Sequence, residues 1–503
     1  KTNFNSSNDQ LFIDWLRIVV QRELVLNDNN LLFNTPYNSD NIEGTTYILK
    51  GFSTQPYVMD ISNPISPKLL SVSASGNDFE LIYYRGSNLQ VIAQNNLFSP
   101  KKGLLIPNQN IKELTNYPDY IVITSEELLS QALELAEYRS TQGLIPLVVT
   151  QSQIFNEFSG GLKDPSALRD YVKYIYDEAL SNGELLPKYL LLFGDTSYDP
   201  KGIIKNGLTN HVITYESKES VHRTGTFGTE ARAYISKLKT YENPKNKGAW
   251  QSLVTFAADD DFPKPLENKD LHTFNADLSA EMMNVNEPGI RIKKIYEFSY
   301  PIEINGTGRQ IPEATKDLMS TINNGTLVLS YLGHGNEQTL TDEELFTSDY
   351  ITDFTNKDKL CVLITATCQF GRYDDTGAQS GAEKFVLATN GGAIASFTTT
   401  RVVYTGSLIG TNTNFALSIA LSQKMSERNP DGTPKRLGDI AMQTKNTILA
   451  GFNSRIGASL NNKKFVLLGD PASVFQLPSK RAQLSSISNI DVLSQDTLIT
   501  VRA

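Results

Sequence analysis

The chain has 503 residues and a formal net charge of −9. Hydrophobic residues make up 40% and charged residues 20%, which is typical of a folded protein and excludes a mainly disordered chain. The negative charge and the lack of any dense Lys/Arg run argue against a nucleic-acid partner. No apolar run approaches the ~20 residues that span a bilayer, so we expect no transmembrane segment in this chain.

The first 112 residues predict a β-rich N-terminal domain. Short apolar stretches there are separated by Gly, Pro, Asn and Ser, a pattern typical of hairpins and small sandwiches. These stretches are Thr46–Leu49, Tyr57–Met59, Leu81–Tyr84 and Val91–Ala93. The region shows no concentration of catalytic residue types, and we interpret it as a structural or interaction module.

From about residue 120 the pattern changes to strands that alternate with helices. This alternation predicts an α/β fold with mainly parallel sheets flanked by helices. We expect one subdomain over residues 113–248 and a second over residues 249–478. The predicted strands are 120–124, 145–149, 189–193, 253–257, 292–296, 326–331, 360–366, 393–397 and 465–468. The predicted helices include 126–141, 165–180, 314–323, 382–388 and 413–425. After Pro478, Ser-rich strand-like sequence predicts the start of an Ig-like β module over residues 479–503.

Two cysteines, Cys361 and Cys368, lie in one apolar run. If that run is a strand, their Cα atoms are roughly 23 Å apart at ~3.3 Å per residue. A disulfide requires less than ~7 Å, so we expect two free thiols. His211, His222 and His272 show no metal-ligand spacing, and we expect all three at the surface. These histidines and cysteines therefore predict no metal site.

The most informative local pattern places His334 and Cys368 just past the ends of successive strands. Two glycines flank His334, and the carboxyl ends of parallel strands are where such sheets bind ligands. The two side chains would face each other if the strands are neighbours. An imidazole beside a thiol makes it a better nucleophile, and the N–H groups of Gly335 and Cys368 could form an oxyanion hole.

Simpler interpretations carry equal weight on these residues alone. A free cysteine at a strand end is most often a small buried hydrophobic residue, and a histidine beside glycine is most often a turn residue.

Several motifs resemble the gingipain family of caspase-like cysteine peptidases, and the resemblance covers about residues 117–478. They are Tyr331-Leu-Gly-His-Gly-Asn-Glu, Thr355-Asn-Lys-Asp-Lys, Ala366-Thr-Cys-Gln-Phe-Gly-Arg-Tyr-Asp-Asp, Leu192-Phe-Gly-Asp and Leu467-Leu-Gly-Asp-Pro. The resemblance implies two caspase-like subdomains, with His334 as general base and Cys368 as nucleophile. It implies no cofactor for the chemistry and leaves room for structural calcium.

The resemblance also implies further site residues. A carboxylate that orients the histidine corresponds to Asp259, with Asp260 as the nearby alternative. On the residues alone, Asp259–Asp261 is also compatible with an acidic loop at a strand end or with a cation site. Arg401 and Tyr404 lie in the loop that shapes the substrate pocket in this family, although surface or packing roles are equally compatible with their sequence context. No gingipain-type pocket is evident, so no Arg or Lys specificity is expected.

Within the family, Arg372-Tyr-Asp-Asp and Thr399-Thr-Arg most resemble the C-terminal signal peptidases (sortases) of type IX secretion. This resemblance implies cargo proteins with a C-terminal sorting domain, a PorV-like outer-membrane barrel partner and a lipopolysaccharide-type acceptor. The expected location is the outer face of a Gram-negative outer membrane. The alternatives are a secreted gingipain-like endopeptidase and a non-catalytic binding scaffold.

One departure from the family pattern lies near Thr229. The family usually has an Asp-rich stretch and a strand before a helix such as 230–241, whereas here Thr226-Phe-Gly-Thr runs straight into Glu230. Either residues are missing from the sequence around Thr229, or this edge of the first subdomain lacks a strand.

Overall fold

A computed structural model describes most of the chain. The described residues are 23–26, 30–35, 44–83, 86–99, 103, 105–197, 199, 211–213, 228–260, 271–306, 308–374, 379–403, 413–451 and 461–478. The chain divides into two compact units, residues 1–107 and residues 108–503. The predicted β module over 479–503, His222, Tyr404 and most of the segment before Thr229 lie outside the described residues.

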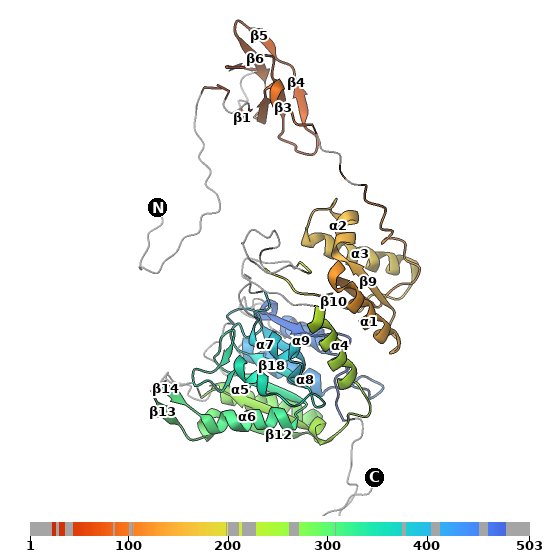
Figure 1. The fold of residues 1–503 in the computed structure, drawn as a ribbon, viewed down its shortest axis with the longest axis vertical. Helices are drawn as coiled ribbons and strands as arrows, with labels where there is room; N and C mark the ends of the chain where they lie inside the picture. The colour runs from red at the N-terminus through yellow and green to blue at the C-terminus, as the bar shows by residue number, and fades with distance from the viewer. Residues whose placement is uncertain are drawn as a thin grey trace, which may run out of the picture. The chain divides into compact units, whose positions relative to one another are not determined.

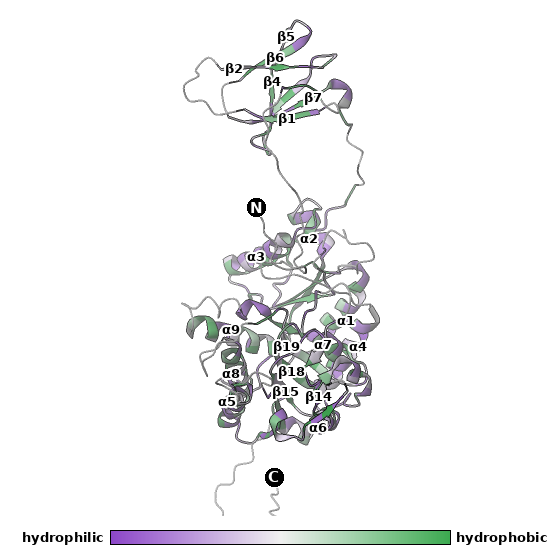
Figure 2. Cartoon of the chain, turned by 90° about the vertical axis from the view of Figure 1, so that its left-hand side faces the viewer, coloured by the Kyte–Doolittle hydropathy of each residue, from purple (hydrophilic) through white to green (hydrophobic). Residues whose placement is uncertain are grey.

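The N-terminal unit contains two antiparallel sheets, whose strands are labelled in Figures 1 and 2. The four-stranded sheet has the order β1 (Asn30–Asn34), β7 (Asn88–Ile92), β3 (Tyr57–Asp60), β4 (Lys68–Leu70). The three-stranded sheet has the order β2 (Thr45–Leu49), β6 (Asp78–Tyr83), β5 (Ser73–Ser75). Alternate residues of β7, Leu89 and Val91, are buried in a core that also contains Leu49 and Leu81 of the second sheet. The predicted β-rich region is confirmed.

The second unit begins with a three-stranded parallel sheet. Its order is β10 (Tyr189–Phe193), β8 (Tyr120–Thr124), β9 (Pro146–Thr150). The helices around it are α1 (Leu129–Ser140), α2 (Gln151–Phe158), α3 (Pro165–Asn182) and α4 (Gly228–Tyr241). Helix α3 begins at a sequence signal, because Asp164 caps its N-terminus ahead of Pro165 and Gly183 adopts the left-handed conformation at its end (φ +69°).

A six-stranded sheet follows and forms the centre of the unit. Its order is β12 (Arg291–Tyr296), β11 (Leu253–Ala258), β15 (Val328–Leu332), β18 (Cys361–Ala366), β19 (Ala393–Thr399), β20 (Phe465–Leu468). Five strands run parallel, and β20 is antiparallel to β19. Every residue of β15, β18 and β19 is buried, as expected for strands covered on both faces.

Helices cover both faces of this sheet. Figure 2 shows α5, α8 and α9 on one side of β15, β18 and β19, and α4, α6 and α7 on the other. Their bounds are α5 Leu271–Asn286, α6 Pro312–Asn324, α7 Gly381–Leu387, α8 Thr413–Ser426 and α9 Leu437–Gly451. Two short hairpins, β13 (Glu303–Asn305) with β14 (Gly308–Gln310) and β16 (Thr339–Leu340) with β17 (Phe346–Thr347), complete the unit. One continuous hydrophobic core joins the two parallel sheets. Within the described residues, no helix is both long and apolar enough to cross a bilayer.

Candidate active site

The three predicted catalytic residues follow three adjacent parallel strands. Asp259 follows β11, His334 follows β15 after one glycine, and Cys368 follows β18 after one threonine. The last paired residues of these strands, in register with one another, are Ala258, Leu332 and Ala366. Because neighbouring strands lie ~4.8 Å apart, His334 and Cys368 stand side by side at one sheet edge. The expectation that their strands are neighbours is confirmed.

The two loops that carry histidine and cysteine pack directly on each other. A β-carbon added to Gly335 would lie 2.7 Å from Thr367 Oγ1 and 2.8 Å from the Thr339 carbonyl oxygen. A contact this close leaves no room for a side chain. The glycine after His334 is therefore required to bring its turn against the residue that precedes Cys368.

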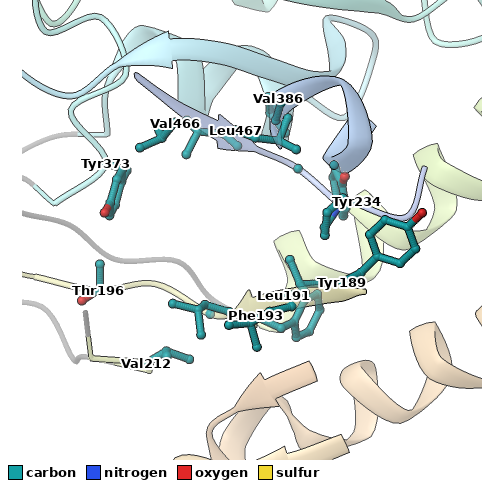
Figure 3. A pocket seen from close by; sticks show the side chains of 18 of the residues that line it. Tyr189, Leu191, Phe193, Thr196, Val212, Tyr234, Tyr373, Val386, Val466 and Leu467 are labelled. Carbon is teal, nitrogen blue, oxygen red and sulfur yellow. The ribbon is translucent and has the colours of Figure 1, made fainter. Parts of the chain in front are cut away.

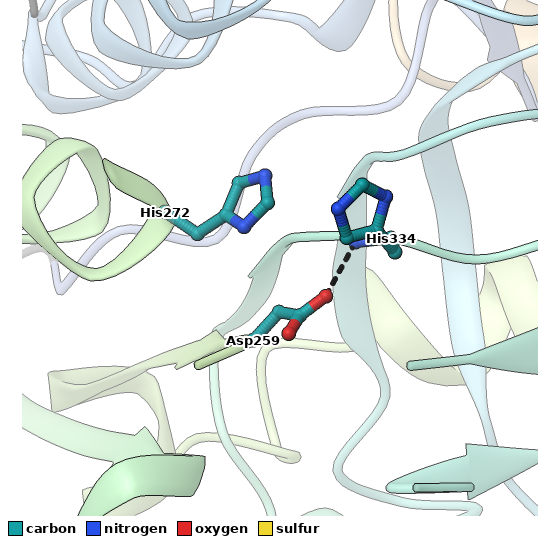
Figure 4. A group of neighbouring side chains, drawn as sticks. All are labelled: Asp259, His272 and His334. Atoms are coloured by element: carbon teal, nitrogen blue, oxygen red, sulfur yellow. Dashed lines mark hydrogen bonds between the residues drawn. The ribbon is translucent and has the colours of Figure 1, made fainter. Parts of the chain in front are cut away.

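Asp259 holds the histidine loop through the backbone. The N–H of His334 donates to Asp259 Oδ2 at 2.8 Å, as Figure 4 shows, and the N–H of Asp259 donates to the Leu332 carbonyl at 3.1 Å. A β-carbon on Gly333 would overlap both Asp259 and the buried Tyr331 hydroxyl. The alternative acid, Asp260, instead forms an ion pair with Arg309.

His272 lies in this site, which corrects the expectation of a surface role. It is 5% exposed at the start of α5, and its ring meets the His334 ring edge-to-face with 5.2 Å between centroids. Asp259, His272 and His334 each bring a potential ligand atom within 4.8 Å of the others (Figure 4). Sequence spacing could not reveal this, because His272 reaches the site only through the packing of α5 against β11 and β15. His211 is also buried, at 8% exposure, so that surface expectation is wrong too.

The two cysteines are free thiols, as predicted, but their environments differ. Cys361 is 1% exposed inside β18, and burial raises the pKa of its thiol to about 12. Cys368 is partly exposed beyond the strand end. Gln369, the next residue, has a φ of +59°, a conformation that non-glycine residues seldom adopt outside functional sites. This sharp turn follows the thiol directly, and the sequence gives no sign of it.

The backbone around the thiol also offers free hydrogen-bond donors. Among the described residues, the N–H groups of Gly335 and Cys368 donate to no acceptor. Both are in loops at the same sheet edge, and unpaired N–H groups are the donors that an oxyanion hole needs. This arrangement is compatible with the predicted oxyanion hole.

Two ion pairs fix the loops that surround the site. Arg372, which follows Cys368, pairs with Glu337, which follows His334, with 2.5 Å between Nη1 and Oε1. Arg401 is 8% exposed and binds both carboxylate oxygens of Asp374, at 2.9 and 2.5 Å. Burial raises the pKa of Asp374, although its pairing with Arg401 opposes that effect. Arg401 therefore links the loop after β19 to the loop after β18.

A cavity of about 550 Å³ lies away from this site. Its walls come from the free edges of the two sheets, β10 on one side and β20 on the other, with Tyr234 of α4 and Val386 of α7 (Figure 3). None of Asp259, His334 and Cys368 lines it. The cavity therefore does not take part in the arrangement described above.

A thiol and an imidazole at adjacent strand ends of a caspase-like α/β fold define the class of cysteine peptidases. The sequence profile of Peptidase family C25 matches residues 113–229 and 225–475, which is more than half of the chain. The chain therefore belongs to Peptidase family C25, the gingipain peptidases. Peptidases of this type need no cofactor for catalysis.

Two solved gingipain structures agree with this chain in fold. The crystal structure of the Arg-specific cysteine proteinase gingipain R (RgpB) has a TM-score of 0.53 and 16% identity, covering 75% of this chain and 82% of RgpB. The Porphyromonas gingivalis complex of RgpB pro- and mature domains has a TM-score of 0.52 and 17% identity, covering 72% and 81%. Dimeric latent PorU from the same organism has a TM-score of 0.49 and 19% identity, covering 90% of this chain and 40% of PorU. No curated protein sequence matches the chain significantly.

Proposed function

We propose that this peptidase removes C-terminal sorting domains from type IX secretion cargo. Cys368 is the nucleophile, His334 the general base and Asp259 the residue that positions the histidine. The single observation that carries this assignment is the convergence of all three at the carboxyl ends of β11, β15 and β18.

The reaction proceeds in two steps. The Cys368 thiol loses its proton to the His334 imidazole, and the sulfur attacks the carbonyl carbon of the scissile peptide bond. The negative oxygen of the tetrahedral intermediate accepts hydrogen bonds from the N–H groups of Gly335 and Cys368. Collapse breaks the C–N bond, and the imidazolium gives its proton to the departing amine. A thioester on Cys368 remains.

The second step decides between peptidase and sortase. Water that attacks the thioester yields a free carboxylate, whereas a primary amine yields a new amide bond, and both restore the thiol. We propose that a surface-lipid amine of lipopolysaccharide type is the acceptor. The support is the resemblance of Arg372-Tyr-Asp-Asp and Thr399-Thr-Arg to the type IX sortases.

An ion pair joins those two motifs, and it bears on which substrates the enzyme accepts. Arg401, the last residue of the second motif, is buried against Asp374, the third residue of the first. The Asp374 carboxylate is thus neutralised from within the chain. We propose that the Asp374 carboxylate does not bind the Arg or Lys side chain of a substrate. The enzyme would then not be a gingipain-like endopeptidase that cleaves after Arg or Lys.

The proposed location and partners follow from this activity. The enzyme would act at the outer face of the outer membrane, where sorted cargo emerges, and be held there by a PorV-like barrel.

The test is mass spectrometry of a cargo protein that bears a C-terminal sorting domain, incubated with this chain and a primary amine. The expected product lacks the sorting domain and carries the amine, and it disappears with Cys368→Ala but not with Cys361→Ala. A product with a free carboxylate would leave a plain endopeptidase. Product formation that survives Cys368→Ala would contradict the assignment, and no product from either form would favour a binding scaffold.

A further inference from the structure

Two histidines and a carboxylate converge at the carboxyl edge of the six-stranded sheet. Asp259 follows β11, His272 is the second residue of α5, and His334 lies in the turn after β15. One potential ligand atom of each lies within 4.8 Å of those of the other two. The two imidazole rings meet edge-to-face, with 5.2 Å between their centroids (Figure 4). Two histidines and one carboxylate, with a fourth position left open, are the ligand set of a common class of zinc site.

The three side chains differ in how firmly the fold holds them. Asp259 and His272 are 2% and 5% exposed, and the His272 ring also packs edge-to-face on Phe415 of α8, with 5.8 Å between centroids. His334 is exposed, so a cation can reach the site from solvent. Ligand atoms that lie ~2.0–2.1 Å from a tetrahedral Zn²⁺ are ~3.3 Å apart. An adjustment of ~1.5 Å or less therefore brings the three atoms to this separation, and the exposed His334 ring has room to turn.

The chemistry of the ligand atoms selects zinc. Imidazole nitrogens bind Zn²⁺ well, whereas Ca²⁺ and Mg²⁺ prefer oxygen ligands. A carboxylate offers about four lone-pair positions, so Asp259 can bind a cation while its Oδ2 still accepts the His334 N–H at 2.8 Å. The spacing in the sequence gives no sign of the site, because only the packing of α5 brings His272 beside His334.

We propose that Asp259, His272 and His334 form a zinc site that switches the peptidase off. Bound zinc takes up the lone pair of the His334 imidazole, which then cannot accept the Cys368 proton, and release of the metal restores the base. Zinc binding depends only on the three ligand side chains. Inhibition also rests on the proposed role of His334 as general base, so binding and inhibition are measured separately.

The first measurement is isothermal titration calorimetry of the whole chain with ZnCl₂, at neutral pH and in excess Mg²⁺. All samples carry Cys368→Ala, so that the thiol supplies no zinc ligand and the result does not depend on activity. His272→Asn removes one imidazole from the site. His211→Asn is the matched control, because His211 is the buried histidine near the edge of the three-stranded sheet and lies outside the cluster. Circular dichroism checks that both variants fold.

The parent and His211→Asn should bind zinc at this site with the same affinity. His272→Asn should lose affinity by at least about 100-fold, since changing a residue that only supports a metal ligand commonly costs ~10–100-fold. X-ray absorption at the zinc edge of the parent should show two imidazole ligands and no sulfur, a result that needs no variant of His272. Equal affinities in the parent and His272→Asn, bound zinc without two imidazoles, or no saturable binding would overturn the zinc site.

The second measurement uses the chain with Cys368 intact and follows cargo cleavage with and without ZnCl₂, each variant against its own zinc-free rate. The zinc concentration that halves the rate should rise in His272→Asn by the same factor as the dissociation constant. Zinc that binds through His272 and leaves cleavage unaffected would overturn the inhibitory role and remove His334 as general base. A chain that binds zinc as expected but cleaves no cargo would support the zinc site and contradict only the proposed substrate.

Discussion

The three-stranded and six-stranded sheets of the second unit, residues 108–503, both carry a histidine near their carboxyl edge. In the smaller sheet, His211 is buried, and its Nδ1 lies 3.3 Å from the Ser125 hydroxyl and 3.1 Å from the Glu127 carboxylate. In the larger sheet, His334 is exposed, its ring makes no hydrogen bond within the described part of the chain, and Cys368 follows the next strand.

The difference shows what turns a sheet edge into a catalytic site. An imidazole whose nitrogen is already engaged by neighbours fixes a loop, whereas one with free nitrogens beside a thiol can move a proton. Only the larger sheet has the two glycines that bring the histidine turn against both Asp259 and the thiol loop. A histidine near the carboxyl edge of a sheet therefore stabilises a loop in the smaller sheet and is placed for proton transfer in the larger one.

The largest expected effect comes from the nucleophile. Cys368→Ala should lower kcat/KM for cargo cleavage roughly 10⁴-fold or more, because covalent catalysis is lost, while the melting temperature stays unchanged. Cys361→Ala, inside the buried strand β18 that leads to Cys368, should keep full activity and lose about 1 kcal/mol of stability. If the two variants exchanged these phenotypes, the assignment would be wrong. Steady-state kinetics and thermal unfolding measure both.

A second pair of variants tests the two histidines directly. His334→Ala should reduce kcat roughly 10³-fold or more with little loss of stability, since the side chain is exposed. His211→Ala should cost about 1–3 kcal/mol, because its side-chain hydrogen bonds are buried, and should leave kcat nearly unchanged. Comparable kcat losses in both would show that the two sheet edges are not functionally different.

A smaller effect is expected at the acidic partners of the histidines. Asp259→Asn retains a hydrogen-bond acceptor for the His334 N–H but loses the charge, so kcat should fall about 10–100-fold. Glu127→Gln, the corresponding change beside His211, should alter kcat less than twofold because Glu127 is exposed and remote from the thiol. The same kinetic assay reports both, and an inert Asp259→Asn would remove Asp259 from the mechanism.

The mildest test is selective alkylation of the thiols. Iodoacetamide reacts with thiolates, and the thiolate fraction of Cys361 rises only as the pH approaches its pKa of about 12. Between about pH 6 and 9 we therefore expect label on Cys368 alone, located by peptide mass mapping. Label on Cys361 in the folded protein at pH 7 would show that β18 is less buried than described.

The sequence predicted the site residues that come just after the predicted strands. His334 and Cys368 could be placed because apolar strands lead into them, and Asp259 because the family motif aligns with the end of β11. The contribution of His272 could not be predicted, since it depends on how α5 packs.

The burial of Arg401 was equally hidden. A charged residue in sequence looks exposed unless its partner is known, and Asp374 pairs with Arg401 only through the contact of two loops. The surrounding fold imposes the left-handed backbone conformation of Gln369. Because the residue is not a glycine, the sequence does not indicate this conformation.

The decisive experiment on the nucleophile is to trap its covalent intermediate. The chain is mixed with a cargo peptide spanning the sorting-domain junction, quenched in acid within the first turnover, digested and analysed by mass spectrometry. If Cys368 is the nucleophile, an acyl adduct of the N-terminal cargo fragment forms on the peptide that contains Cys368, and it is absent when His334 is replaced by alanine. Cleavage of the cargo with no adduct on Cys368, or with the adduct on another residue, would contradict this assignment of the nucleophile.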